Sequence, residues 1–259
     1  MKIVMHLLSF AGGLILSSCV TLYKPNTIHS PLLKHKGEAN TSALLGLSGS
    51  GLANLQAAYA ISNHTGLMID GMYHNKRSKS NDSITEKLNI LFVEAGAGYF
   101  TTFGSKENRL FQCYAGGGYG NTTDIIHDSN PTNPEANAKY FNLFIQPGIA
   151  YLNKGIEVAL DLRGNYVRMF DINASLYDKF EWWNTNFKYY SHASLDFMNL
   201  EPNITLKTGN EKIKGILQLG LIIPTINSKS YFDVNTSSML IGPLIKFSLG
   251  LSYSFGTKN

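Results

Sequence analysis

The residues best suited to acid–base chemistry are three histidines in polar stretches of the sequence, His74, His127 and His192. Asp124 and Asp128 lie close to His127, and serines are frequent nearby. A histidine beside a serine can activate a nucleophile, and a histidine beside two aspartates can hold a metal ion. The spacing matches no such motif, and most histidines in loops are simply solvated. The sequence therefore predicts no catalytic residue, no metal site and no cofactor.

Charged residues inside alternating stretches form a second group. Glu157, Asp161 and Arg163 stand at alternate positions between apolar residues. Because successive side chains of a β-strand point to opposite faces, the three charges share one face and the apolar residues share the other. Charges are very unfavourable against lipid, so we expect their face to line a polar lumen.

The same phase places four more charged residues on inward faces: Asp70, Glu94, Glu201 and Lys246. Unpaired charge is costly in a confined space of low dielectric constant. We therefore expect an ion network that braces the lumen, in which Arg163 pairs with Glu157 and Asp161 of its own strand. A conduction path is the alternative role for these charges.

The alternation recurs along the chain and predicts ten strands. Their ranges are 38–48, 51–61, 65–74, 87–101, 109–120, 139–152, 155–168, 194–207, 212–224 and 240–255. The gaps after the second, fourth, sixth and eighth strands are short. Those after the third, fifth, seventh and ninth are long and polar, covering 75–86, 121–138, 169–193 and 225–239. This arrangement is typical of an outer-membrane barrel, with turns in the periplasm and loops outside.

The fold class predicted is all-β: one antiparallel up-and-down transmembrane β-barrel over residues 37–259, with about ten strands and both termini in the periplasm. Whether eight or ten strands close the barrel stays open. Charged residues are only 15% of the chain, whereas Gly (24), Tyr (14) and Phe (14) are abundant, as curved strands with aromatic edges require. The net charge of +4 is small and scattered, which argues against nucleic acid as a partner.

The first residues have the features of a targeting signal. Lys2 precedes an apolar stretch, 7–16, that is too short to span a bilayer, and two serines follow it. The run Leu16-Ser17-Ser18-Cys19 resembles the lipobox of bacterial lipoproteins. We therefore expect a signal peptide over 1–18, lipid on Cys19 and a periplasmic tether over 19–36, with a plug in the barrel mouth as the less favoured alternative for the tether. Cys113 would then have no intramolecular disulfide partner.

Several short motifs resemble the opening of outer-membrane β-barrel lipoproteins of Bacteroidota. They are Tyr23-Lys24-Pro25-Asn26, Pro31-Leu32-Leu33, Gly37-Glu38 and Leu55-Gln56-Ala57-Ala58-Tyr59-Ala60. The resemblance implies a fold and a location in the outer membrane, and it brings no catalytic residues. Asp82-Ser83-Ile84 also resembles the short O-glycosylation acceptor of those bacteria, which marks Ser83.

The stretch 169–193 is rich in aromatic residues, among them Trp182, Trp183, Tyr189 and Tyr190. Large apolar side chains in a polar loop mark a contact surface for an extracellular partner, or they pack together over the barrel mouth. The function predicted is structural, adhesive or surface-interacting, not enzymatic, with outer-membrane lipids as partners. The alternatives are a narrow passive pore, a lipid-modifying barrel enzyme and a soluble carrier with its apolar face inside.

Lipid on Cys19 is directly testable. Mass spectrometry of the mature amino terminus is expected to find an acylated Cys19, and Cys19→Ala should stall lipoprotein processing while the barrel still assembles. Cys113→Ala serves as the control and should leave processing unchanged. An unmodified Cys19, or cleavage at another position, would rule the lipobox out.

Overall fold

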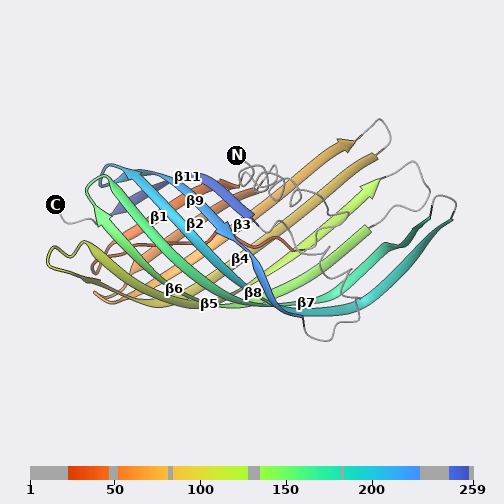
Figure 1. Cartoon of the computed structure of the whole chain (residues 1–259), viewed down its shortest axis with the longest axis horizontal. Helices are drawn as coiled ribbons and strands as arrows, with labels where there is room; N and C mark the ends of the chain where they lie inside the picture. The colour runs from red at the N-terminus through yellow and green to blue at the C-terminus, as the bar shows by residue number, and fades with distance from the viewer. Residues whose placement is uncertain are drawn as a thin grey trace, which may run out of the picture.

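The strands of the chain form one antiparallel sheet that closes into a barrel (Figure 1). The computed structural model describes residues 23–46, 52–80, 84–127, 135–181, 184–227 and 245–256. Within these ranges the strands are β1 (Ala39–Gly46), β2 (Leu52–Ala60), β3 (Thr65–Ser80), β4 (Ile84–Phe103), β5 (Arg109–His127), β6 (Glu135–Asn153), β7 (Ile156–Glu181), β8 (Asn184–Gly209), β9 (Ile213–Leu221), β10 (Ile223–Asn227) and β11 (Ile245–Phe255). In the same ranges no helix is long and apolar enough to cross a membrane.

Closure of the sheet depends on β9 and β11. β11 pairs with β1 on one side and with β9 on the other, and β9 pairs in turn with β8. Only Ile222 separates β9 from β10, and β10 also pairs with β8. The two segments together therefore occupy one strand position in the barrel. The barrel is therefore ten-stranded, which confirms the predicted all-β antiparallel barrel of about ten strands. The side of the membrane on which each terminus lies stays a prediction.

The alternation within strands is confirmed by burial. In β6, Leu143, Ile145 and Ile149 are exposed on the outside, whereas Asn142 and Gln146 are buried inside. The strands thus present apolar residues to the surroundings and polar residues to the middle of the lumen. A soluble carrier would need the opposite, a polar outer face and an apolar interior. The soluble alternative is therefore wrong.

The two ends of the barrel differ. One end, here called the turn-end mouth, carries the short connections 61–64, 104–108, 154–155 and 210–212. The other, the hairpin-end mouth, carries the connections that the sequence predicts to be long. Three of the four long loops predicted are largely strand, because β3 to β8 pair far beyond the apolar belt, up to Glu181 paired with Asn184. The backbone ladder needs no apolar side chains, so an apolar alternation underestimates the length of such strands.

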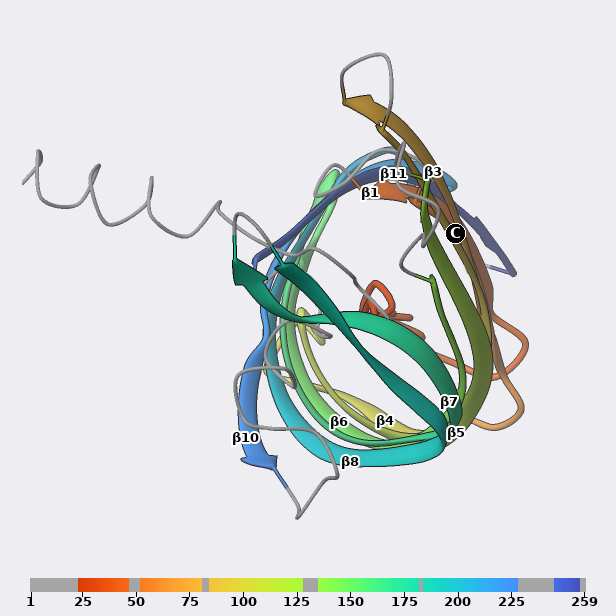
Figure 2. The same ribbon diagram turned by 90° about the vertical axis from the view of Figure 1, so that its right-hand side faces the viewer.

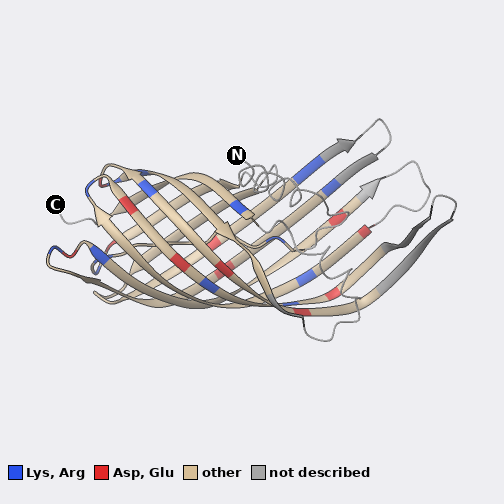
Figure 3. Cartoon of the chain, in the orientation of Figure 1, with Lys and Arg blue, Asp and Glu red and all other residues tan. Residues whose placement is uncertain are grey.

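The outward faces form an apolar belt. It consists of exposed Leu, Ile and Val residues on every side, such as Leu160 on β7 and Leu249 on β11. Exposed tyrosines edge it: Tyr59, Tyr99, Tyr151 and Tyr253 toward the turn-end mouth, and Tyr73 and Tyr119 toward the hairpin-end mouth. Beyond these edges lie exposed charges, Lys154 and Lys212 at one end and Lys139 and Arg168 at the other. Figure 3 marks the charged positions, and those within the belt described here face inward. An apolar band between aromatic girdles is the surface that a membrane barrel requires.

Because this belt is expected to contact lipid, an arginine introduced on it should destabilise the barrel more at the middle of the belt than at its edge. Leu160 lies about midway along β7 between Ile156 and the charged edge at Arg168, so Leu160→Arg is expected to lower the free energy of unfolding by about 2–4 kcal/mol. Ile156→Arg, on the same strand and face but beside a turn, should cost about 0–1 kcal/mol. Equilibrium unfolding from lipid vesicles measures both, and equal costs would contradict a membrane-embedded belt.

Candidate functional site

The lumen is filled by the chain's own amino-terminal segment. Every residue from Tyr23 to Leu33, here called the plug, is buried. Figure 2 looks along the barrel and shows this segment, in red, inside the ring of strands. Burial of residues 23–33 contradicts the periplasmic tether predicted for this part of 19–36 and agrees with its alternative, a plug. Residues 19–22 lie outside the described part of the chain.

The plug has no regular secondary structure, so its backbone relies on the wall for hydrogen bonds. Five consecutive carbonyl oxygens, those of residues 26 to 30, each accept a bond from a long wall side chain. The donors and distances are Lys246 Nζ to Asn26 (3.0 Å), Gln56 Nε2 to Thr27 (3.1 Å), Gln218 Nε2 to Ile28 (2.8 Å), Gln146 Nε2 to His29 (2.7 Å) and Lys207 Nζ to Ser30 (2.7 Å). A buried carbonyl without a donor is costly, so these five bonds permit an extended chain in the lumen.

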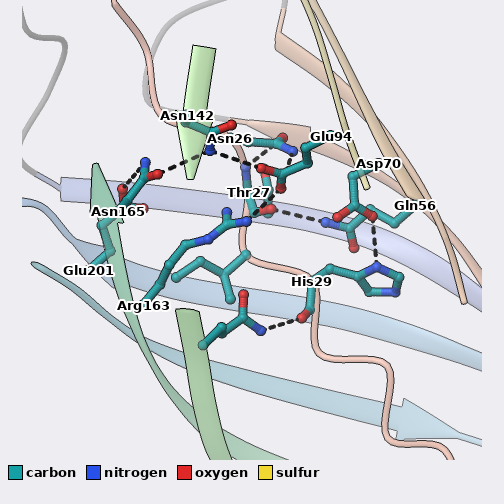
Figure 4. Close-up of polar contacts among 12 residues, drawn as sticks. Asn26, Thr27, His29, Gln56, Asp70, Glu94, Asn142, Arg163, Asn165 and Glu201 are labelled. Atoms are coloured by element: carbon teal, nitrogen blue, oxygen red, sulfur yellow. Dashed lines mark hydrogen bonds and ion pairs between the residues drawn. The ribbon is translucent and has the colours of Figure 1, made fainter. Parts of the chain in front are cut away.

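Plug side chains also meet wall carboxylates. His29 Nδ1 lies 2.7 Å from Asp70 Oδ1, and Asn26 Nδ2 donates to Glu94 Oε1 at 3.1 Å (Figure 4). Ser30 Oγ donates to Asp161, which also accepts a bond from Gln112 Nε2 at 2.9 Å. Three of the predicted lumen charges, Asp70, Glu94 and Asp161, are therefore bound to the plug.

Arg163 bridges the lumen from β7 to β4. It is 1% exposed, its Nη2 lies 2.8 Å from Glu94 Oε1, and its guanidinium carbon lies 4.0 Å from the centre of the Phe144 ring. The expected pairing with Glu157 and Asp161 on its own strand is therefore wrong. Same-face neighbours on a strand point in parallel, whereas Glu94 projects toward Arg163 from across the lumen, as Figure 4 shows.

The other predicted charges have partners of their own. Lys246 Nζ lies 2.7 Å from Glu201 Oε2, so this lysine links β8 to the plug carbonyl of Asn26. Glu157 Oε1 lies 2.5 Å from Lys214 Nζ and 3.3 Å from Lys34 Nζ, just after the plug. All seven residues predicted for the network (Asp70, Glu94, Glu157, Asp161, Arg163, Glu201 and Lys246) thus face the lumen.

Apolar layers close the plug at both ends. Toward the hairpin-end mouth, Tyr23 packs edge-on against Tyr140 and Phe197, with ring centres 5.4 and 5.2 Å apart, and belongs to a large buried cluster. Toward the turn-end mouth, Leu32 and Leu33 belong to a second cluster. Its members on the wall are Ala58, Ala60, Met68, Phe100, Leu110, Tyr114, Phe144, Ala150, Leu152 and Ala159. The polar centre of the lumen therefore lies between two apolar layers.

Two glycines make room for the carboxylates that hold the plug. A Cβ at Gly148 would collide with the Asp161 carboxylate, and a Cβ at Gly118 would lie 2.6 Å from the Cβ of Glu94. Gly148 and Gly118 occupy positions directly opposite these acids on neighbouring strands. The absence of a side chain at Gly148 and Gly118 therefore admits the inward side chains of Asp161 and Glu94.

An open vestibule remains at the turn-end mouth. It has a volume of ≈ 640 Å³ and is lined by residues from the turns and by Lys34, Glu38, Glu157 and Lys214. The plug limits the vestibule at Lys34, because the next residue inward, Leu33, is fully buried. The space ends where the lumen is filled.

The histidines considered for catalysis lie in different surroundings. His74 is buried, with Nε2 2.9 Å from Lys24 Nζ of the plug. His192 is exposed on β8, where its Nδ1 lies 2.8 Å from Asp171 Oδ1. Hydrogen bonds from Lys139 and His192 hold the pKa of the Asp171 carboxyl below its ordinary value. No group of three metal-binding side chains occurs among the described residues.

Several predicted sites lie outside the part of the chain that the structure describes. They are Cys19, Ser83, Asp128, Trp182 and Trp183. Tyr189 and Tyr190 lie in the β8 ladder, opposite Ser175 and Ala174, but their side chains are not described. Two further donors to the plug, Lys207 and Gln218, were given no role from the sequence, although the alternation places both on inward faces.

Comparison with known proteins finds similarity at the level of structure alone. No family model matches the chain, and no curated protein matches it. The translocator domain of autotransporter NalP from Neisseria meningitidis is similar, with a TM-score of 0.47 and 10% identity, covering 84% of this chain and 86% of that one. A major outer membrane protein from Thermus thermophilus has a TM-score of 0.41 and 13% identity, covering 85% of this chain and 100% of that one.

The buried Arg163–Glu94 pair makes a quantitative prediction. Arg163→Met should lower the free energy of unfolding by about 3–5 kcal/mol, because it leaves Glu94 buried without its cation. Adding Glu94→Gln should recover part of that loss, as measured by a double-mutant cycle in denaturant.

Arg168 provides the control for this pair. Its Nε lies 3.7 Å from Asp196 Oδ1 in an ion pair that is partly exposed to solvent. Arg168→Met should therefore cost about 1 kcal/mol or less. Additive losses for Arg163→Met and Glu94→Gln would show that the two side chains are not coupled.

Proposed function

We propose that this protein is an outer-membrane β-barrel with a structural or surface-interacting role, whose lumen is sealed by its own amino-terminal segment. The observation that carries the proposal is the unbroken burial of the plug, with five consecutive carbonyls bonded to the wall. A location in the bacterial outer membrane is supported by the apolar belt and its aromatic edges.

Sealing follows from the order of layers along the lumen. An ion crossing the barrel needs a continuous path of water, and apolar constrictions interrupt such a path. Here the Tyr23 cluster and the Leu33 cluster lie on either side of the polar centre. In the centre itself, five plug carbonyls are bonded to wall side chains, and the plug occupies the space that a column of water would need.

The long strands beyond the belt supply the surface for a partner. β7 and β8 pair as far as Glu181 and Asn184, well past the charged belt edge at Arg168. With turns in the periplasm, these hairpins project outside the cell. The β7–β8 hairpin, which contains the aromatic stretch 169–193, is the element that we assign to extracellular contact. Lipid on Cys19 would add a second attachment to the membrane.

A pore is the second candidate, since the wall is lined with polar side chains that would hold water if the plug left the lumen. Catalysis ranks third. His74 is committed to a plug contact and His192 to Asp171, so neither is placed beside a serine by the contacts described. We propose that the protein is not an enzyme.

Conductance in planar bilayers separates a sealed barrel from a pore. The unmutated protein is expected to give no steady current. Gln146→Leu combined with Gln218→Leu removes the donors to two plug carbonyls, at a cost of about 1–3 kcal/mol for each unsatisfied group. The double variant should therefore open more often and give brief currents.

A reversible lock supplies the matched control. Ser30 Oγ of the plug lies 3.1 Å from Thr205 Oγ1 of β8, so Ser30→Cys with Thr205→Cys should form a disulfide that holds the plug in place. In the Gln146→Leu, Gln218→Leu protein carrying Cys113→Ser, oxidation of this pair should abolish the currents and reduction restore them. Large, salt-proportional currents in the unmutated protein would move the pore to first place.

A further inference from the structure

The plug has a direction. At one end, Lys34 pairs with Glu157 on β7, one residue after the strand begins at the turn-end mouth. At the other end, the Tyr23 hydroxyl accepts a hydrogen bond from Asn165 Nδ2, farther along the same strand, at 2.9 Å. From β1 toward the amino terminus, the chain therefore enters the lumen at the turn-end mouth and runs toward the hairpin-end mouth.

The plug meets the rim beside β1, β2 and β11. Lys24 and Pro25 line a small cavity together with Gly46 at the end of β1, Leu52 at the start of β2 and Lys246 near the start of β11. These three wall positions belong to the hairpin end of their strands. The carboxyl end lies at the opposite mouth, where the Gly256 carbonyl is 3.0 Å from Nε2 of His35.

The length of chain between Cys19 and Tyr23 decides which side Cys19 can reach. Four residues span at most about 14 Å when fully extended. The wall partners of Tyr23 and Lys34, Asn165 and Glu157, are separated by about 26 Å along β7 at a rise of about 3.3 Å per residue. Return through the lumen is also blocked, because the plug residues and the wall around them are buried against each other.

We propose that the chain is threaded through its own barrel, so that its amino terminus is displayed at the hairpin-end mouth, on the cell surface. This rests on the proposed function, which sets the barrel in the outer membrane with its turns in the periplasm. Acyl chains on Cys19 would then enter the outer leaflet beside β1, β2 and β11, not the periplasmic leaflet. The two ends of the chain lie on opposite sides of the membrane.

Labelling of single cysteines in intact cells tests the direction. Thr21→Cys and Thr257→Cys are each made in the full chain carrying Cys113→Ser and treated with a membrane-impermeant maleimide. The Cys113→Ser chain without either substitution is treated in parallel, and its labelling, which reports any free thiol at Cys19, is subtracted. Thr21→Cys should be labelled at least tenfold more than Thr257→Cys in intact cells, and lysis should make the two equal. Labelling of Thr21→Cys only after lysis would overturn the proposal.

A cross-link distinguishes failure of threading from failure of the sealed lumen. Ser30→Cys with Thr205→Cys, in the same background, should form a disulfide in intact cells, seen as a mobility shift that reduction removes. If the cross-link forms but Thr21→Cys is reached only from the periplasmic side, the lumen is sealed and the direction is wrong. If no cross-link forms, both proposals fail.

Discussion

The structure depends on one constraint: an extended chain enclosed in a barrel cannot satisfy its own carbonyl groups. A helix in the lumen would bond its backbone internally, whereas the plug needs a donor from the wall at each step. Lys246, Gln56, Gln218, Gln146 and Lys207 supply these donors from five different strands. The spacing of long polar side chains around the wall therefore matches the spacing of carbonyls along the plug, and the position of the plug along the lumen follows from that match.

The charges of the lumen are matched in the same way. Asp70 faces His29, Glu94 faces Asn26 and Arg163, and Asp161 faces Ser30 and Gln112. Without the plug, Asp70 would lose its contact with His29 and Asp161 one of its donors, and a buried carboxylate without partners is strongly unfavourable. Wall and plug thus stabilise each other, and an empty barrel of this sequence would have to hydrate its lumen instead.

The barrel could be predicted from the sequence because its signal is local. A two-residue period in apolar residues defines each strand, and the short turns set the pairing. The plug could not, since Pro25 and Pro31 interrupt any period and its partners lie up to 220 positions away. For the same reason, the alternation along the strands placed Arg163 and Glu94 in the lumen but could not predict that their side chains form a pair across it. The sequence did not predict the long hairpins of β3 to β8, because backbone pairing between these strands continues past the point where apolar residues stop alternating with polar ones.

The hydrogen bonds of the plug join residues that are far apart in the sequence, and this determines when they can form during assembly of the barrel. The plug lies next to β1 in sequence, yet Gln218 and Lys246 belong to β9 and β11, which are 190 and 220 positions from their plug partners. The barrel closes only when β11 pairs with β1. Because the chain cannot easily enter a closed and filled lumen, the plug must be enclosed while the sheet curls around it. Two of the five carbonyls gain their donors only as β9 and β11 arrive, so closing the barrel and sealing the lumen are one cooperative step.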